Sequence, residues 1–204
     1  MKKILNKVLN IDKKTFYFLA IISIIGIITG ALFMTVLSTS DKEIVYNSLN
    51  DYITNIGSIK LNIKEFLSNF LLNILYVLII WILGISVVGL PIVIIVIFFK
   101  SFLVSFTVSS FIINYKIKGL LYSLIYIFPH MIVNLLIYIY LGIYSIKLSI
   151  SIIKAIFSKK SINFKNSMVS YLKIFIFSFI LIIVTTLYET YFVPFILKKV
   201  ISMI

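Results

Sequence analysis

The sequence has no cysteine, no arginine, one histidine and only six acidic residues among 204. Without cysteine it can form no disulfide, no thiolate metal site and no cysteine nucleophile. Without arginine it lacks the forked guanidinium group that reads bases and phosphates. Its lysines are scattered singly and in pairs, so the net charge of +13 does not predict a nucleic-acid-binding protein. Charged residues make up 12% of the chain, too few to cover a soluble globule.

Long apolar runs take up most of the chain instead. Hydrophobic residues make up 62% of it, and the mean hydropathy is +1.18. The first run, residues 15–37, is long enough to cross a hydrocarbon core of about 30 Å. It follows a lysine-rich start and is not followed by an A-x-A cleavage pattern, so we expect a permanent anchor. The fold class predicted is all-α, a polytopic membrane helix bundle in a single domain, 1–204.

The second apolar run, residues 67–113, is too long for one crossing. As one helix it would measure about 70 Å. We expect it to break at GISVVGLP, which holds Gly84, Gly89 and Pro91. Proline lacks the N–H that a helix interior needs and disfavours helical backbone in the residue before it, and the two glycines add flexibility. The run therefore predicts two helices joined by a tight turn.

Two further crossings complete the bundle. After the link NYKIKG, residues 114–119, the fourth span carries Pro129 and His130, and we expect a kink there. The fifth ends just before Pro194. The five predicted spans are 15–37, 67–88, 91–113, 120–141 and 171–193.

The charged segments between the spans predict the orientation. Residues 38–66 hold four of the six acids and predict a solvent-side loop with one short amphipathic helix. Residues 143–170 hold five lysines with apolar residues at helical spacing between them, which predicts an amphipathic segment on the membrane surface. The first 14 residues also hold five lysines, and lysine-rich segments stay in the cytoplasm. Four crossings put both on that side, so we expect a cytoplasmic N-terminus and an external C-terminus.

Two ionisable residues fall inside predicted spans. Lys100 lies near mid-membrane, where a lysine costs about 2.5 to 3.5 kcal/mol to insert. Glu189 is the only acid in any span, but its Cα should lie about 12 Å nearer the outer surface, by the rise of a helix. Two interpretations stay open. The lysine stem reaches backbone carbonyls or a wet pocket, which we favour, or it forms an ion pair with Glu189.

The remaining polar positions in the spans predict packing rather than chemistry. Ser101, Ser105 and Ser109 recur every four residues, a stripe of small side chains that lets another helix approach closely. Ser86 and His130 could form a hydrolytic pair only within about 3 Å, yet they should lie at different depths. We expect His130 to be a hydrogen-bonded interior residue. The sequence has no H-E-x-x-H, G-x-S-x-G, Walker A or EF-hand pattern, so we expect no enzyme activity, metal or cofactor.

Three segments resemble the stage II sporulation protein M family, and they occur in the family's order. They are WILGISVVGLPIVIIVIFFKSFLVSFTVSSF at 81–111, FPHMIVN at 128–134 and YETYFVP at 188–194. The most specific part is L-G-I-S-x-x-G-L-P, followed nine residues later by lysine. Two departures predict packing that differs in detail: the serine stripe stands where the family has glycines, and FPHMIVN replaces L-P-Q-N.

The resemblance implies a non-enzymatic membrane subunit of the engulfment machinery of endospore-forming bacteria. It implies a multi-pass protein of the cell membrane, specifically the mother-cell membrane that migrates around the forespore. Its partners would be membrane lipid and stage II sporulation proteins D and P, cell-wall hydrolases that thin the septal peptidoglycan, and a homo-oligomer is compatible with this. A transporter or permease subunit stays open as the alternative, because broken helices and mid-membrane charges recur at solute pathways.

Overall fold

The computed structural model describes residues 12–55, 63–127, 129–158 and 164–201, and every element in them is helical. Within these residues, five helices are long and apolar enough to cross a membrane, which confirms the predicted class. The lysines at 2, 3, 7, 159 and 160, used above to predict orientation, lie outside the described residues. In chain order the elements are α2 (Lys13–Val36), α3 (Thr39–Asn55), α4 (Ile63–Gly84), α5 (Gly89–Ile127), α6 (His130–Ser158), α7 (Phe164–Leu187), the π-helical turn η1 (Tyr188–Phe192) and α8 (Val193–Ile201).

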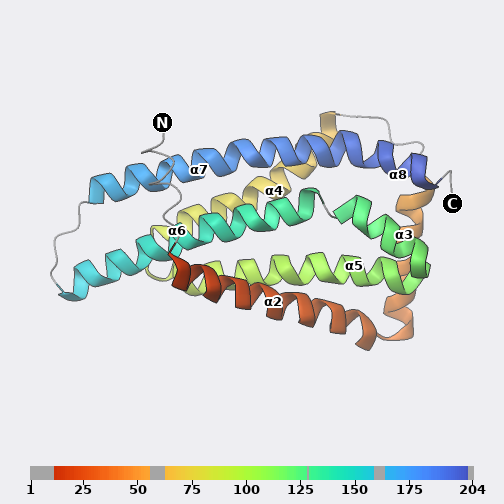
Figure 1. The fold of residues 1–204 in the computed structure, drawn as a ribbon, viewed down its shortest axis with the longest axis horizontal. Coiled ribbons are helices and arrows are strands. Elements are labelled where there is room, and N and C mark those ends of the chain that lie inside the picture. The colour runs from red at the N-terminus through yellow and green to blue at the C-terminus, as the bar shows by residue number, and fades with distance from the viewer. Residues whose placement is uncertain (1–11, 56–62, 128, 159–163, 202–204) are drawn as a thin grey trace.

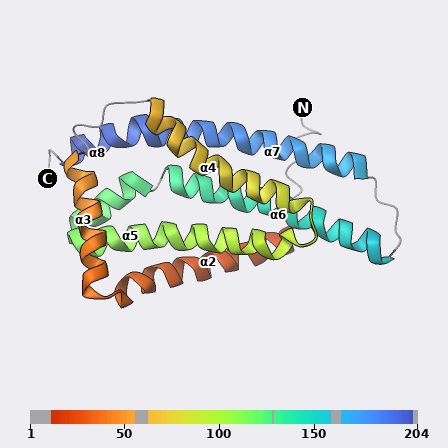
Figure 2. The same cartoon turned by 180° about the vertical axis from the view of Figure 1, so that it is seen from behind.

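The long helices run side by side, and the bundle has two distinct ends (Figures 1 and 2). At one end, called the α3 end, α3 lies across the bundle close to α8. At the other, called the turn end, lie the α4–α5 turn, the start of α2 and the start of α7. The described chain therefore begins and finishes at opposite ends, as an odd number of crossings requires. That the turn end faces the cytoplasm stays a prediction from the lysine counts.

Local caps fix the first two helices. Asp12 accepts hydrogen bonds from the backbone N–H of Lys14 at 3.2 Å and from the hydroxyl of Thr15 at 2.8 Å. The hydroxyl bond lowers the pKa of this exposed carboxyl. Ser38 accepts from the N–H of Asp41 at 3.2 Å and so begins α3, the amphipathic helix expected in the polar loop.

The α4–α5 turn forms at the predicted GISVVGLP break. The helix α4 ends at Gly84, four residues before the predicted end, and three short-range backbone bonds close the turn. A side chain on Gly89 would collide with the backbone of Leu83, so the close approach requires glycine there. Pro91 lies in the first turn of α5, where its missing N–H needs no partner.

The third and fourth crossings are joined by a sharp reversal at Lys116. Its backbone has φ 53° and ψ −126°, and it divides α5 into two helical pieces. The second piece folds back so closely that a Cβ on Gly119 would meet the backbone of Phe111. The reversal falls in the predicted link. A second break precedes His130, which confirms the kink expected at Pro129, and α6 then completes the crossing.

The fourth crossing extends further along the chain than predicted. The sequence placed it at 120–141, but the long apolar helix is His130–Phe157. Ile143 and Ile146 are buried in the core, and the hydroxyl of Ser149 donates to the carbonyl of Gly84 at 3.0 Å.

The prediction that the chain lies on the membrane surface from residue 143 onward is therefore wrong for residues 143–149, most of which are buried in the bundle. Their lysine, Lys147, lies on the exposed side of a helix whose other side is the centre of the bundle. The apolar residues between the lysines form an inner face of α6 that packs in the bundle, not a face that lies on lipid.

Candidate functional site

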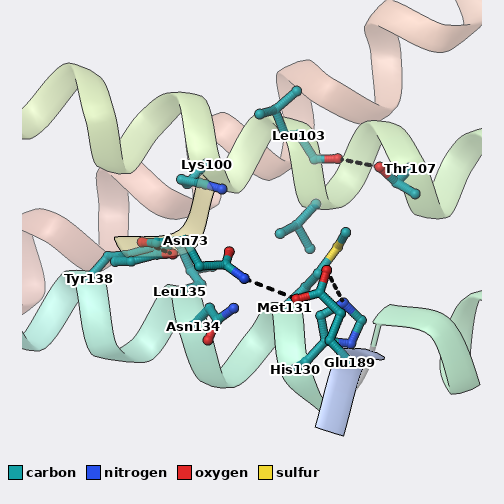
Figure 3. Close-up of a pocket in the computed structure, with 11 residues that line it drawn as sticks. Asn73, Lys100, Leu103, Thr107, His130, Met131, Asn134, Leu135, Tyr138 and Glu189 are labelled. Carbon is teal, nitrogen blue, oxygen red and sulfur yellow. Dashed lines mark hydrogen bonds and ion pairs between the residues drawn. The ribbon is translucent and has the colours of Figure 1, made fainter. Parts of the chain in front are cut away.

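A cavity of about 230 Å³ lies inside the bundle between α4, α5, α6 and η1 (Figure 3). Leu103, Val104, Met131 and Leu135 form its apolar walls. The polar residues that line it are Asn73, Lys100, Thr107, His130, Asn134, Tyr138 and Glu189. Polar and ionisable side chains inside a membrane bundle are costly and mark functional sites.

Glu189 reaches the cavity from the π-helical turn. Pro194 cannot donate a backbone hydrogen bond to Thr190, four residues earlier, and its ring crowds that carbonyl. The backbone widens instead, and the N–H of Val193 bonds the carbonyl of Tyr188, five residues back. Single π turns are frequent at functional sites. The proline singled out in the sequence therefore shapes the segment that carries the membrane-embedded acid.

Among the described residues, the carboxylate of Glu189 has one hydrogen-bond donor and one close basic neighbour. Its Oε2 accepts from Nδ2 of Asn73 at 3.0 Å, and its Oε1 lies 3.8 Å from Nε2 of His130. The second distance is an ion-pair distance if the imidazole is protonated, but it is too long for a hydrogen bond. Only 19% of the Glu189 side chain is exposed.

His130 is buried without the hydrogen bond expected from the sequence. Its side chain is 1% exposed, and neither ring nitrogen has a hydrogen-bond partner in the described part of the chain. The ring packs edge-on against Tyr126, with centroids 5.8 Å apart. The predicted interior position of His130 is confirmed, but the prediction that its ring is hydrogen-bonded is wrong. A neutral imidazole has one donor and one acceptor nitrogen, so His130 keeps two buried polar atoms without partners beside the cavity.

Lys100 lies on the same cavity as Glu189 without touching it. Its Nζ is 3.5 Å from the ring centroid of Tyr76 and 5.6 Å from that of Tyr138. Cation–π contacts of this kind offset part of the cost of a buried charge. Across the described residues, no carboxylate lies within 4.0 Å of this ammonium group. Of the two open interpretations, the structure agrees with the first: Lys100 lines a polar pocket. It does not form a direct ion pair with Glu189.

Amides and hydroxyls connect the helices around the cavity. Nδ2 of Asn73 also lies 3.4 Å from the hydroxyl of Thr186, and the backbone carbonyl of Asn73 accepts from the hydroxyl of Tyr138 at 3.3 Å. The hydroxyl of Thr185 donates to Oδ1 of Asn134 at 2.6 Å. Sequence reasoning overlooked both asparagines. The signal was present, because an amide inside an apolar span needs a partner on another helix.

The serine stripe lies at a different contact, between α2 and α5. Ser101 and Ser105 are buried, and Ser109 is half-buried. A Cβ added at Gly26 of α2 would lie 2.9 Å from the Cβ of Ser101 and 2.6 Å from the carbonyl oxygen of Phe98. The small residues thus let two backbones nearly touch, and none of the three serines lines the cavity.

The other predicted residues lie away from the cavity as well. Gly84, Gly89 and Pro91 shape the α4–α5 turn at the turn end, and so does Ser86, whose hydroxyl accepts from the N–H of Val88 at 3.3 Å. The backbone carbonyl of Ser86 accepts from the hydroxyl of Ser149 on α6 at 3.1 Å, whereas His130 begins the same helix 19 residues earlier, about 28 Å away at 1.5 Å per residue, so Ser86 and His130 do not form a pair. Among the residues the structure describes, no group of three or more histidine or acidic side chains could hold a metal ion.

The model of the family described as stage II sporulation protein M matches residues 19–194. That range reaches from the first turns of α2 to the start of α8. The chain belongs to the stage II sporulation protein M family. Comparison with curated proteins gives no match, and comparison with solved structures gives none either.

The segments that carry the likeness to the stage II sporulation protein M family meet at the cavity. The first supplies Lys100, FPHMIVN supplies His130 and Asn134, and YETYFVP supplies Glu189. Segments far apart in the sequence thus converge on one polar site in this family member.

Proposed function

We propose that this protein is a non-enzymatic scaffold of endospore engulfment. It holds peptidoglycan hydrolases at the mother-cell membrane while the septal wall is thinned and the membrane migrates. The observation that carries the proposal is the family match over residues 19–194, which includes part or all of each of the five crossings. The partners we propose are stage II sporulation proteins D and P.

The surface we propose for these partners is α3. Ring contacts fix this helix to the bundle, with Tyr46 6.1 Å from Tyr115 and Tyr52 5.1 Å from Tyr126. The helix exposes polar residues and Ile44, which is 63% exposed. By the lysine counts this end faces the wall, so a partner outside the membrane meets α3 first.

A pair of matched substitutions tests this assignment. Ile44 on α3 and Ile156 near the end of α6 are both 63% exposed, and they lie at opposite ends of the bundle. In sporulating cells, Ile44→Asp should lower recovery of the two hydrolases with the tagged protein on the order of tenfold, as loss of an interface anchor does. Ile156→Asp should leave recovery unchanged. Equal recovery with both variants would remove α3 as the docking surface, and no recovery with the unsubstituted protein would remove the scaffold.

The orientation is tested separately with reporter fusions. Fusions after residue 50, after residue 117 and at the C-terminus should report the outside, and one at residue 160 the cytoplasm. A cytoplasmic signal from the C-terminal fusion would place α3 and α8 on the wrong side for wall enzymes.

The polar cavity favours one second candidate, a subunit of a transporter. A lysine, a histidine and a glutamate around an internal space are the residues that line solute pathways in membranes. Gene context separates the two functions. Genes for wall hydrolases expressed together with this one favour the scaffold, and an adjacent ATPase gene favours transport.

A further inference from the structure

The cavity presents a positive and a negative group to the same space. Lys100 lies on α5 and Glu189 on η1, across the cavity from each other (Figure 3). The ammonium group rests on tyrosine rings, and the carboxylate is held by Asn73. Among the described residues, no carboxylate lies within 4.0 Å of the ammonium group, and the one basic side chain that close to the carboxylate is His130, at 3.8 Å. Two separated opposite charges in a weakly polar interior make a strong local field.

That field selects the charge pattern of a ligand. A simple cation would be repelled by Lys100, and a simple anion by Glu189. A molecule that carries both charges, a few bonds apart, satisfies both groups at once. Electrostatic complementarity of this kind sets specificity and orientation in buried sites.

Two further residues that line the cavity carry polar atoms without hydrogen-bond partners among the described residues. Both ring nitrogens of His130 are buried and without partners among the described residues, and the ring lines the cavity. Asn134 uses Oδ1 to accept from Thr185, which leaves its amide N–H groups as donors. Buried polar atoms left unpaired are costly, so a bound molecule that supplies their hydrogen bonds would stabilise the site.

The size of the cavity limits the ligand. At about 230 Å³ it is far larger than the space one water needs. It is also smaller than the roughly 300 to 1,000 Å³ typical of sites for drug-sized molecules. A solute of a few heavy atoms fits both limits.

We propose that this cavity binds a small zwitterion, with its acidic group on Lys100 and its ammonium group on Glu189. The inference goes beyond the scaffold role and does not depend on it. Two sources share this chemistry: a free short α-amino acid, and the phosphoethanolamine headgroup of a membrane lipid. His130 and Asn134 supply the remaining hydrogen bonds in either case.

The first test uses soluble probes on the full chain, purified in a detergent free of amine lipids. Alanine carries both charges, while propionate and ethylamine each keep one. Calorimetry and thermal unfolding should show saturable binding of alanine or of phosphoethanolamine. Propionate and ethylamine should bind about tenfold more weakly or worse, because each leaves one buried charge unpaired.

The second test uses matched variants. Lys100→Met and Glu189→Gln should each abolish the zwitterion preference, while Lys173→Met and Glu65→Gln make the same changes at exposed positions and should not. Val104→Phe keeps both charges but fills the cavity, so it should block binding even if the charge variants fold poorly. Unchanged binding in Val104→Phe would overturn the assignment of the site.

The third test separates the two sources. The protein is placed in nanodiscs of phosphatidylglycerol alone or with phosphatidylethanolamine. A rise in unfolding temperature with phosphatidylethanolamine only, removed by Val104→Phe, identifies the headgroup. Alanine binding that is independent of lipid identifies a free amino acid. No saturable effect of alanine, phosphoethanolamine or phosphatidylethanolamine, or an equal effect of propionate, would overturn the proposal.

Discussion

The α2–α5 contact and the polar cavity are two solutions to the same problem, that of holding helices together where lipid is as apolar as the side chains. Between α2 and α5, Gly26 and Gly30 bring one backbone against the other. Around the cavity, Asn73 and Asn134 bridge to hydroxyl and carboxylate groups on neighbouring helices. The first contact depends on closeness and the second on hydrogen bonds. The second contact surrounds a cavity.

The largest expected effect breaks the close contact. A Cβ on Gly30 would collide with the backbone carbonyl of Phe102, which cannot move alone. We expect Gly30→Ala to lower the free energy of unfolding by about 2 to 3 kcal/mol, the upper range for overpacking. Gly142→Ala is the control, because its Cβ would lie 2.7 Å from Cδ1 of Ile97, a flexible side-chain end. Equal losses in reversible unfolding of the purified chain would contradict backbone contact as the cause.

The second prediction weakens the hydrogen-bonded region. Asn73→Leu removes the donor to Glu189 and leaves that carboxylate without its hydrogen bond. The loss should be about 2 kcal/mol, the cost of a buried polar group left unsatisfied. Asn47→Leu on exposed α3 makes the same change and should stay within about 0.5 kcal/mol. If the two variants unfold alike, the amide does not support the acid.

The third prediction concerns the reversal that leads from the packed helix α5 towards the polar region. Lys116 is exposed and has φ 53°, which a side chain tolerates poorly. Lys116→Gly should raise the free energy of unfolding by about 1 kcal/mol. Lys147→Gly, at an exposed position inside α6, should lower it by about 1 kcal/mol. The same sign for both would show that the reversal is unstrained.

The smallest effect lies at the start of α2, outside both regions. Asp12→Ala removes the cap and should cost about 0.5 to 1 kcal/mol. The pKa of Asp12 is lowered in the fold, so the carboxylate stabilises the helix above the usual pKa of aspartate and loses this effect as the pH falls through the lowered value. Unfolding of the Asp12→Ala variant between pH 3 and 6 should lack this contribution. An identical pH profile for both proteins would exclude the cap.

The sequence predicted features that follow from local chemistry. The break at GISVVGLP, the kink at Pro129 and the close approach along the serine stripe each arise from a residue's own backbone or size. The features that it missed depend on how the helices pack against one another. The lysines of α6 suggest a helix on the membrane surface, and only its packing shows that the opposite side of α6 is buried. The cavity brings together Asn73 and Glu189, which are 116 residues apart in the chain. The π turn at Tyr188–Phe192 also escaped prediction, because a proline can end, kink or widen a helix and the sequence does not show which.

We propose that this family member organises partners and performs no reaction itself. His130→Gln tests it most directly, because the variant removes the imidazole beside Glu189, the nearest thing to an acid–base pair in the described structure. Membrane migration around the forespore is scored in sporulating cells, together with protein level and recovery of the two hydrolases. We expect migration close to normal. Migration lost while the protein level and hydrolase recovery stay unchanged would contradict a purely structural role.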